Sequence, residues 1–496
     1  MGESVLDILV MLVGSNPLPA FIVGRFLSSP RPVGNGPPTP NRIVLIYSSR
    51  SDDNHGGTRG FSHEIKELLV AKTMVPETAI SEFSVGSDAR DFGKIEQAIK
   101  SGLEGACTGN QTAEVRSVHI NITGGTKPMA VQAYAVAATA LEHGLKSILS
   151  AKSNVNADGC RFFVSDVNPE TRKLQVYELP SGGGNQTASL MRKLCSLPGI
   201  GDLRDTVNLT FEELAKLHSI EVKDHGRSEL RMGQSVDIDG FAYHALQDGD
   251  SGPLRTLCRI IGDDETYKDE SRKARRENNE PQRDLMVQQA QGGLLKRLEN
   301  GTSVDGQRAW SDFCAKYEPT LGGLVVGKRY AGDADRSAGM FVDFLTGKWL
   351  EEYVFSLVRK WFIGPAQSNR QCDARLGIEI EYSNRKSELD VVLLQWYELT
   401  LFSCTTASSI AMVKQKGFEA VFRADEFGGE HAKVVLVSNI PDEKKTDPDR
   451  SVEGLKYDFK TFEATRNVHF ITHQDLKKAT EGSGNELEDM VKQWLR

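Results

Sequence analysis

The sequence predicts an α/β protein in which two α/β domains are joined by a connecting region. Residues 5–150 alternate short apolar strands with helices, a pattern typical of a parallel sheet covered by helices on both faces. A second series, with a helix, three strands, another helix and further strands, begins near residue 341. A flexible Gly-rich stretch at 181–185 ends the first series and marks the first domain boundary.

The overall composition places limits on the function. A chain of 496 residues has room for two to four domains, at about 100–200 residues each. The net charge of −8 means that any nucleic-acid site has to be a local basic patch. The seven cysteines are scattered and form no C-x-x-C pair, which argues against a thiolate zinc site and for a reducing compartment.

The first domain is expected to contain strand–helix repeats and a closing hairpin. Strands are predicted at 6–13, 42–47, 80–85 and 115–122, helices at 18–27, 61–71, 92–103 and 129–143, and hairpin strands at 162–164 and 174–179. Residues 5–27 are a membrane candidate by hydropathy, but Asp7, Asn16 and Pro17 interrupt them and no basic leader precedes them. We therefore expect a strand, a loop and a helix there, and a cytoplasmic protein without a membrane segment.

The stretch from Val118 to Leu141 carries the clearest binding motif. Its apolar strand stops at Thr123-Gly124-Gly125-Thr126-Lys127, and Pro128 follows where the first turn of a helix tolerates proline. Glycines permit backbone conformations closed to other residues, and the start of a helix leaves amide groups without partners. Such a corner suits an anion, most often a phosphate, and the two threonines and the lysine add hydroxyls and a cation. The alternative is an ordinary turn into a packing helix.

Three polar loops are predicted to meet at one edge of the first sheet. They are Gly14–Pro17, Ser48–Gly60 and Thr123–Lys127, and each follows a strand. Because the ligands of such sheets gather at the carboxyl ends of the strands, this convergence favours a binding site. A dinucleotide-binding enzyme is a weak alternative, since no Gly-x-Gly-x-x-Gly follows the first strand and no ribose-binding acid lies about 20 residues further on.

The remainder of the chain divides into a connector and a second α/β domain. With boundaries at 1–180, 181–335 and 336–496, the middle part is interpreted as an irregular or helical connector. Its mixed-charge run, Asp263–Asp284, is more typical of a solvated helix or loop than of a nucleic-acid contact. The last domain is predicted to have helices at 341–361 and 412–427 and strands at 377–382, 388–394, 399–405, 432–437 and 467–472.

Two loops, Gly14-Ser15-Asn16-Pro17-Leu18-Pro19 and Asn121-Ile-Thr-Gly-Gly-Thr-Lys-Pro-Met129, together resemble a CARF domain, the Rossmann-like sensor of CRISPR ancillary proteins. The resemblance implies binding of a cyclic oligoadenylate made by type III CRISPR complexes, usually cyclic tetra-adenylate, across the interface of a homodimer. The residues that it implies for ligand binding are Ser15, Asn16, Ser48, Ser49, Thr123, Gly124, Gly125, Thr126 and Lys127. A cyclic ring of phosphates needs amides, hydroxyls and a cation, and a symmetric ring suits two copies of one site.

The C-terminal segments GKWLEEYV and SELDVVLL resemble the PD-(D/E)XK nuclease domain that follows CARF in effectors of the Card/Can type. The resemblance implies a nuclease of DNA or RNA in which carboxylates hold Mg²⁺ or Mn²⁺ at the scissile phosphate and a lysine helps to orient or activate water. It implies Asp390 and Glu351 as catalytic residues and metal ligands. The family has a Glu-x-Lys on the third strand, and Ser403-Cys404-Thr405 stands in its place here.

Several nearby side chains are candidates for replacing the missing pair. Glu388 shares a strand face with Asp390, Glu398 begins the third strand, and Lys414 and Lys416 follow on the next helix. We assign Glu388 and Lys414 as further catalytic candidates, although each is also compatible with a solvated surface charge. Two functions remain open: a ligand-activated nuclease with a rearranged site, or a sensor whose silent nuclease-like domain signals through a partner or a conformational change. The ring size of the activator, the choice between DNA and RNA, and degradation of the activator by its own pocket also remain open.

Overall fold

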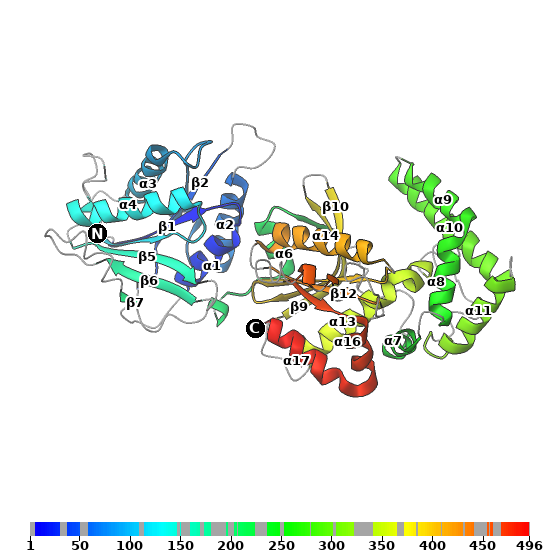
Figure 1. Cartoon of the computed structure of the whole chain (residues 1–496). Coiled ribbons are helices and arrows are strands. Elements are labelled where there is room, and N and C mark those ends of the chain that lie inside the picture. Colours follow the sequence, from blue (N-terminus) through cyan, green and yellow to red (C-terminus); the bar gives the residue numbers. More distant parts are fainter. Residues whose placement is uncertain are drawn as a thin grey trace. The chain divides into compact units, whose positions relative to one another are not determined.

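The computed structural model is a mixed α/β fold with two compact units, residues 1–221 with 427–430 and residues 222–426 with 431–496 (Figure 1). The structure describes residues 5–29, 37–49, 58–108, 114–145, 149, 159–168, 173–179, 195–196, 203–205, 207–223, 236–248, 252–277, 279–300, 304–321, 341–364, 372–382, 385–407, 409–429, 432–440, 454–455, 457–459 and 468–495. Two mixed sheets with covering helices confirm the predicted α/β class.

The first unit contains a seven-stranded sheet with the order β3-β2-β1-β4-β5-β6-β7. Its strands are β1 (Val5–Val13), β2 (Arg42–Tyr47), β3 (Ile80–Ser84), β4 (Glu114–Asn121), β5 (Arg161–Asn168), β6 (Lys173–Leu179) and β7 (Cys195–Ser196). The first five strands are parallel, and β6 and β7 add antiparallel. The strand order reverses between β1 and β4, because β2 and β3 continue on one side of β1 and β4 lies on the other.

Side-chain alternation along β1 explains why helices cover both faces of this sheet. Leu6, Ile8, Val10 and Leu12 share one core cluster with side chains of α3 (Phe92–Cys107) and α4 (Lys127–His143). Met11, between them, points to the opposite face, where its side chain contacts Gly24 of α1 (Leu18–Leu27). A strand buried on both faces requires the continuous apolar run seen in the sequence. The remaining helices of this unit are α2 (Arg59–Lys72) and α6 (Phe211–Leu217), together with the short turns η1 (Glu77–Ala79) and η3 (Leu203–Asp205). Helix α2 packs against α1.

The second unit is built on a six-stranded sheet with the order β13-β12-β11-β10-β9-β8. Its strands are β8 (Glu221–Lys223), β9 (Cys372–Tyr382), β10 (Arg385–Gln395), β11 (Glu398–Thr405), β12 (Lys433–Ser438) and β13 (Val468–Ile471). β9, β10 and β11 form an antiparallel meander, and β12 and β13 continue it in parallel. β9 begins before the predicted residue 377, because β10 also pairs with its polar first half.

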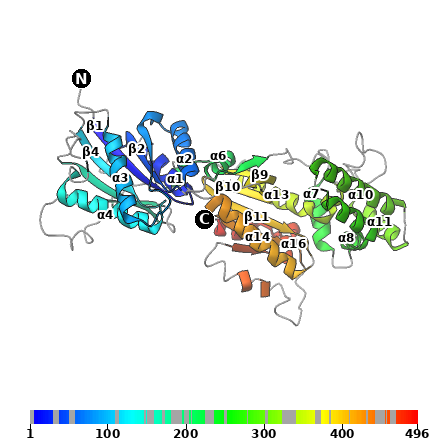
Figure 2. The ribbon, with the colours of Figure 1, turned by 90° about the horizontal axis from the view of Figure 1, so that it is seen from above.

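Helices cover both faces of the second sheet. α14 (Ile410–Gly428) lies on one face, and α13 (Trp349–Phe362), α16 (His473–Lys478) and α17 (Gly484–Trp494) lie on the other (Figures 1 and 2). The π-helical turns η4 (Phe344–Lys348) and η8 (Ala479–Ser483) directly precede α13 and α17. Val391, Phe402 and Val435 of the sheet share one core cluster with Trp349 of α13 and Val491 of α17.

Helices occupy most of the described part of the predicted connector. They are α7 (Ile238–Gln247), α8 (Pro253–Asp263), α9 (Glu265–Arg275), α10 (Glu280–Asn300) and α11 (Val304–Tyr317). Phe241, Leu294 and Phe313 from these helices belong to the same core cluster as Trp349. Because the core is continuous, these helices are part of the second unit. No described helix is long and apolar enough to cross a membrane, and residues 5–27 form β1, a loop and α1 as predicted.

Candidate functional site

The loops after β1 and β4 lie where the strand order of the first sheet reverses. β1 and β4 are parallel neighbours, with Met11 opposite Asn121, so the loops at 14–17 and 122–126 leave the sheet at the same edge. In open α/β sheets, this reversal point at the carboxyl ends of the strands is where ligands bind. The structure therefore brings together two of the three predicted binding loops.

The glycines of these two loops are required by close packing between the loops and against Leu12 of β1. A Cβ atom on Gly14 would overlap the carbonyl oxygen of Gly124, and one on Gly124 would overlap the carbonyl oxygen of Leu12. A Cβ atom on Gly125 would lie 2.7 Å from the Cβ atom of Leu12. The contact of the two loops thus explains these glycines without any ligand, and it fixes the loop that leads into α4.

The start of α4 presents an exposed corner beside this contact. Thr126 is the N-cap of the helix, and its Oγ1 accepts a hydrogen bond from the amide of Met129 at 3.4 Å. Thr126, Lys127 and Ser15 are exposed, and Lys127 forms no ion pair with a described residue. A helix N-terminus with outward amides and an adjacent free cation has the features that bind phosphate.

A buried polar network supports the loop before α4. Asn121, buried at the end of β4, donates from Nδ2 to Thr123 Oγ1 and to Ser165 Oγ, both at 3.0 Å. Thr123 Oγ1 also accepts from the amide of Val167 at 3.1 Å, and Ser165 Oγ is hydrogen-bonded to His119 Nε2 at 2.7 Å. The hydroxyl of Thr123 therefore anchors the loop to β5.

The other predicted ligand-binding side chains also have partners inside the first unit. The amide of Ser48 donates to Thr58 Oγ1 at 2.8 Å, and the hydroxyls of Ser49 and Ser84 are 2.8 Å apart. These contacts join the segment after β2 to the start of α2 and to the end of β3. Asn16 caps the first turn of α1, where its Oδ1 accepts from a backbone amide at 3.1 Å.

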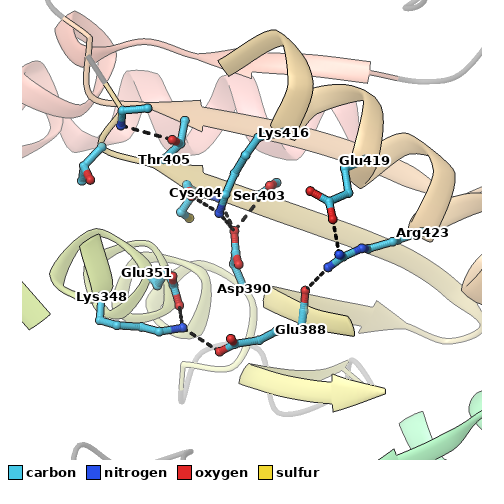
Figure 3. Close-up of polar contacts among 12 residues, drawn as sticks. Lys348, Glu351, Glu388, Asp390, Ser403, Cys404, Thr405, Lys416, Glu419 and Arg423 are labelled. Atoms are coloured by element: carbon cyan, nitrogen blue, oxygen red, sulfur yellow. Dashed lines mark hydrogen bonds and ion pairs between the residues drawn. The ribbon is translucent and has the colours of Figure 1, made fainter. Parts of the chain in front are cut away.

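In the second unit, Asp390 lies where β10 and β11 separate. The two strands pair from Gln395–Glu398 to Val391–Phe402. Beyond that point β10 stays paired with β9, and β11 stays paired with β12 as far as Thr405. The carboxylate of Asp390 enters the opening and accepts a hydrogen bond from the amide of Cys404 at 2.7 Å (Figure 3). A split between two strands thus presents a buried acidic side chain.

A lysine of α14 reaches this aspartate, and it is Lys416. Its Nζ lies 3.5 Å from Asp390 Oδ2 and donates to the carbonyl oxygen of Cys404 at 3.2 Å (Figure 3). Lys414, the catalytic candidate preferred from the sequence, instead forms an ion pair with Asp458. The difference in placement follows from the orientation of α14: both lysines flank its buried side, and of the two only Lys416 lines the cavity beside Asp390.

Glu351 and Glu388 lie beside Asp390 and share one lysine. Lys348 Nζ donates to Glu351 Oε2 at 2.8 Å and to Glu388 Oε1 at 2.6 Å (Figure 3). Glu351 comes from the first turn of α13, and Glu388 from β10. The structure therefore brings the three predicted acids into one cluster, with two ammonium groups among them.

Burial and charge shift the protonation equilibria of this cluster. Burial raises the pKa of Glu351 to about 7, with a further upward contribution from Asp390 and a downward one from Lys348. Burial next to Glu351 also raises the pKa of Glu352 to about 7. The pKa of Lys348 lies above its ordinary value, because the attraction of Glu351 and Glu388 exceeds the opposing effect of burial. Near neutral pH, loss of a proton from Glu351 or Glu352 is therefore less favourable than for an exposed glutamate.

A cavity of about 290 Å³ opens over β10 and β11 beside α14. Its charged lining residues are Lys386, Glu388, Asp390, Lys416, Glu419 and Arg423. Arg423 Nη1 donates to the carbonyl oxygen of Glu388 at 2.6 Å, and its guanidinium pairs with Glu419 (Figure 3). Acidic and basic side chains thus line the same cavity, next to the split between the strands.

The described side chains do not by themselves assemble a site for Mg²⁺ or Mn²⁺. No group of three acidic, histidine or cysteine side chains in the described part of the chain could hold a metal ion. Ser403 and Thr405 replace the carboxylate and the lysine that the resemblance predicted on β11, and Ser403 Oγ lies 3.4 Å from Asp390 Oδ2. Glu351 and Asp390, the predicted metal ligands, are each engaged by an ammonium group. We therefore derive no catalytic step through a metal ion.

Two residues of the site were not identified from the sequence, although it contains signals for both. Lys348 lies three residues before Glu351, which puts the two side chains on one face of a helix. Arg423 follows Lys416 by two helical turns, so both flank the buried side of α14. Helical spacing from the recognised residues would have found each of them.

The raised pKa of Glu351 predicts how stability depends on pH. The folded protein binds this proton more tightly than the unfolded chain, so the contribution of Glu351 to stability is fully present below about pH 4.5 and is lost as the pH rises through about 7. The cost is on the order of 2–3 kcal/mol for this group. Urea unfolding at pH 5 and pH 8 should therefore show a smaller loss of stability in Glu351→Gln than in the wild type. The exposed Glu419 provides the matched variant, Glu419→Gln, and an equal loss in all three proteins would refute the prediction.

Comparisons with known proteins show a shared fold. No protein-family model matches the sequence, and a search of curated proteins found no match. Among solved structures, the chain is similar to protein VC1899 from Vibrio cholerae, with a TM-score of 0.54 and 16% identity over 98% of each chain. It is also similar to Can2 from Sulfobacillus thermosulfidooxidans in complex with cyclic tetra-adenylate, with a TM-score of 0.49 and 14% identity over 99% of each chain. A type III CRISPR defence DNA nuclease activated by cyclic oligoadenylate has a TM-score of 0.37 and 13% identity, over 88% of this chain and 46% of that chain. The match to VC1899 shows that the two proteins share a fold.

Proposed function

We propose that the first unit binds a cyclic oligoadenylate as a sensor of type III CRISPR antiviral defence. Binding then controls a nuclease-like site in the second unit that acts on DNA or RNA. The observation that carries the proposal is the exposed start of α4, with Thr126 and Lys127, at the strand-order reversal. The loops after β1 and β4, which meet there, are the two whose motifs resemble a CARF domain.

The chemistry of the corner suits this ligand. A cyclic oligoadenylate presents phosphates around a ring, and the start of α4 offers outward amides together with Thr126 and Lys127. A symmetric ring is best met by two copies of one site, so we propose that the protein binds it as a homodimer. In this proposal Thr123, Ser48 and Ser49 hold the binding loops in place and do not contact the ligand directly, because their polar groups are hydrogen-bonded within the unit.

The nuclease-like part of the proposal is supported by the arrangement around Asp390. A buried aspartate in the opening between two strands, a glutamate on the preceding helix and a lysine within reach reproduce three of the four expected groups. Lys416 supplies the ammonium group that is missing at Thr405. The Mg²⁺ or Mn²⁺ requirement is part of the proposal.

A specific observation favours a second candidate, a sensor with a silent nuclease-like domain. Ser403 puts no carboxylate at this place on β11, and no described group of three side chains could hold a metal ion. In that case, the domain would signal through a partner or a conformational change. Cutting assays separate the two candidates.

The binding proposal is tested by titrating the protein with cyclic tetra-adenylate, the usual ligand of the family that the loops resemble. We expect Lys127→Met to lower the affinity by roughly ten- to a hundredfold, since a charged hydrogen bond contributes roughly 1.5–3 kcal/mol. Lys72→Met is the matched control, because Lys72 lies in the last turn of α2 and pairs with Glu213. Equal affinity in the wild type and Lys127→Met would remove Lys127 from the site, and no binding of any ring size by the wild type would refute the proposal.

The two neighbouring lysines of α14 provide a matched pair of variants for the nuclease-like site. We expect Lys416→Met to lower ligand-dependent cutting by about a hundredfold or more, because a positioned ammonium group beside the reacting phosphate is lost. Lys414→Met should stay within about threefold of the wild type, since Lys414 pairs with Asp458 and does not contact Asp390. Rates measured on plasmid, single-stranded DNA and RNA with Mn²⁺ decide the matter, and a larger loss in Lys414→Met would restore the original assignment.

A further inference from the structure

Lys348 joins two acidic side chains that come from different elements. Its Nζ atom is 2.8 Å from Glu351 Oε2 on α13 and 2.6 Å from Glu388 Oε1 on β10 (Figure 3). The Glu351 side chain is only 9% exposed, and that of Lys348 is 37% exposed. One ammonium group thus bridges a buried and a half-buried carboxylate, and its own side chain has an open path to solvent.

The backbone around Lys348 is specifically arranged. Phe344–Lys348 forms a π-helical turn directly before α13. The hydroxyl of Thr406, just beyond β11, donates to the carbonyl oxygen of Thr346 in this turn at 2.6 Å. Single π-helical turns are uncommon and often lie at functional sites. The turn therefore ties Lys348 to the end of β11, the strand that lacks the expected Glu-x-Lys.

The charges of the cluster nearly cancel without any metal ion. Three carboxylates, on Glu351, Glu388 and Asp390, lie with the ammonium groups of Lys348 and Lys416. Carboxylates gathered in this way ordinarily neutralise each other's repulsion through a divalent cation. Here Lys348 occupies the bridging position between two of them, which agrees with the absence of a three-ligand metal site among the described residues.

We propose that Lys348 is an internal counter-ion that takes the place of a divalent cation in this cluster. The inference rests on the proposed nuclease-like role of the cluster. The side chains as they lie do not fit a metal ion, because Lys348 engages Glu351 and Lys416 engages Asp390. Removal of the Lys348 charge would take this partner away from the carboxylate of Glu351.

The test is the affinity of the full-length protein for Mn²⁺, measured by calorimetry with MnCl₂ alone. We expect Lys348→Gln and Lys348→Met to bind Mn²⁺ at least about tenfold more tightly than the wild type, because an opposing charge next to the ligands is removed. Glutamine keeps a hydrogen-bond donor, so at least one of the two variants should fold, as checked by circular dichroism. Lys348→Arg keeps the charge and should bind no more tightly than the wild type.

Lys386→Gln is the matched control, because Lys386 also lines the cavity and lies on β10. It should change the affinity less than twofold. Folded Lys348→Gln and Lys348→Met proteins that bind Mn²⁺ no more tightly than the wild type would overturn the proposal, and so would equal gains in Lys348→Arg or Lys386→Gln.

Parallel cutting assays with cyclic tetra-adenylate distinguish failure of this inference from failure of the proposed function. Ligand-dependent cutting by the wild type without a gain in Mn²⁺ affinity in the variants overturns the role of Lys348 and leaves the nuclease. A gain in affinity without cutting by any protein supports Lys348 as the counter-ion and refutes the nuclease activity.

Discussion

Replacing Asp390 by asparagine is expected to abolish ligand-dependent cutting of nucleic acid and to leave ligand binding unchanged. Asparagine has nearly the same size, and its Oδ1 can still accept the hydrogen bond from the amide of Cys404 that Asp390 accepts at 2.7 Å. The negative charge that attracts Lys416 is lost. We expect a loss of at least about a hundredfold, the lower end of what one positioned proton-transfer group contributes.

The measurement compares the wild type and Asp390→Asn on supercoiled plasmid, single-stranded DNA and RNA, in Mn²⁺, with and without cyclic tetra-adenylate. Asp458→Asn is a suitable control, because Asp458 pairs with Lys414 and does not contact the cluster. Full activity in Asp390→Asn would place the chemistry elsewhere in the chain. A wild-type protein that binds the ligand but cuts no nucleic acid would support the sensor with a silent nuclease-like domain. Ser403 and Thr405 would then explain the missing activity.

Replacing Gly124 by alanine is expected to destabilise the first unit and to abolish ligand binding. The added Cβ atom would overlap the carbonyl oxygen of Leu12 and lie 3.0 Å from the Cβ atom of Ala20. Overpacking against movable side chains costs about 1–3 kcal/mol, and a backbone carbonyl inside a sheet cannot move aside as a side chain does. We therefore expect a loss of about 3 kcal/mol or more, together with displacement of the loop before α4.

Denaturant unfolding and calorimetric titration with cyclic tetra-adenylate measure the two effects. Gly60→Ala is the matched control in the same unit, because its Cβ atom would lie 3.7 Å from Ser219 Oγ, an ordinary contact. Gly60 lies in α2, where alanine is favoured over glycine by about 0.5–1 kcal/mol. Wild-type stability and binding in Gly124→Ala would show that the two loops can separate at no cost. The close contact at Gly124 would then be unnecessary for folding and for ligand binding.

Sequence patterns predicted the strand–helix repeats of the first unit and strands β9 to β13 of the second, because those patterns are local. They did not resolve helices α7 to α11, α16 and α17. The apolar run at residues 6–13 predicted β1, in which Leu6, Ile8, Val10 and Leu12 are buried on one face. Pro128 predicted the start of the helix after β4, and α4 begins one residue earlier, at Lys127, with Thr126 as its N-cap. Strand ends were predicted less well: β9 extends to Cys372, since pairing with β10 stabilises polar residues that propensity alone would assign to a loop.

The candidate site likewise contains residues that local motifs identified and contacts that only tertiary packing determines. Asp390 and Glu351 could be assigned from short motifs, and the structure brings them into one cluster with Glu388. The choice between Lys414 and Lys416 could not be made from the sequence, because it depends on how α14 is rotated about its axis on the sheet. The hydrogen bond from the amide of Val167 to Thr123 Oγ1 could not be predicted from the sequence either, since Val167 lies on another strand.

The sequence by itself determined the order and type of the main strands and of the helices between them, and the residue types at the two sites, because strand patterns, helix starts and loop chemistry act over a few residues. Only the tertiary structure decided which charges meet. Lys348 bridges Glu351 and Glu388, and Gly14 touches Gly124, through contacts between segments far apart in the chain. Such pairs are set by the packing of helices on sheets and by strand register, and a sequence pattern that repeats every two to four residues carries no information about either.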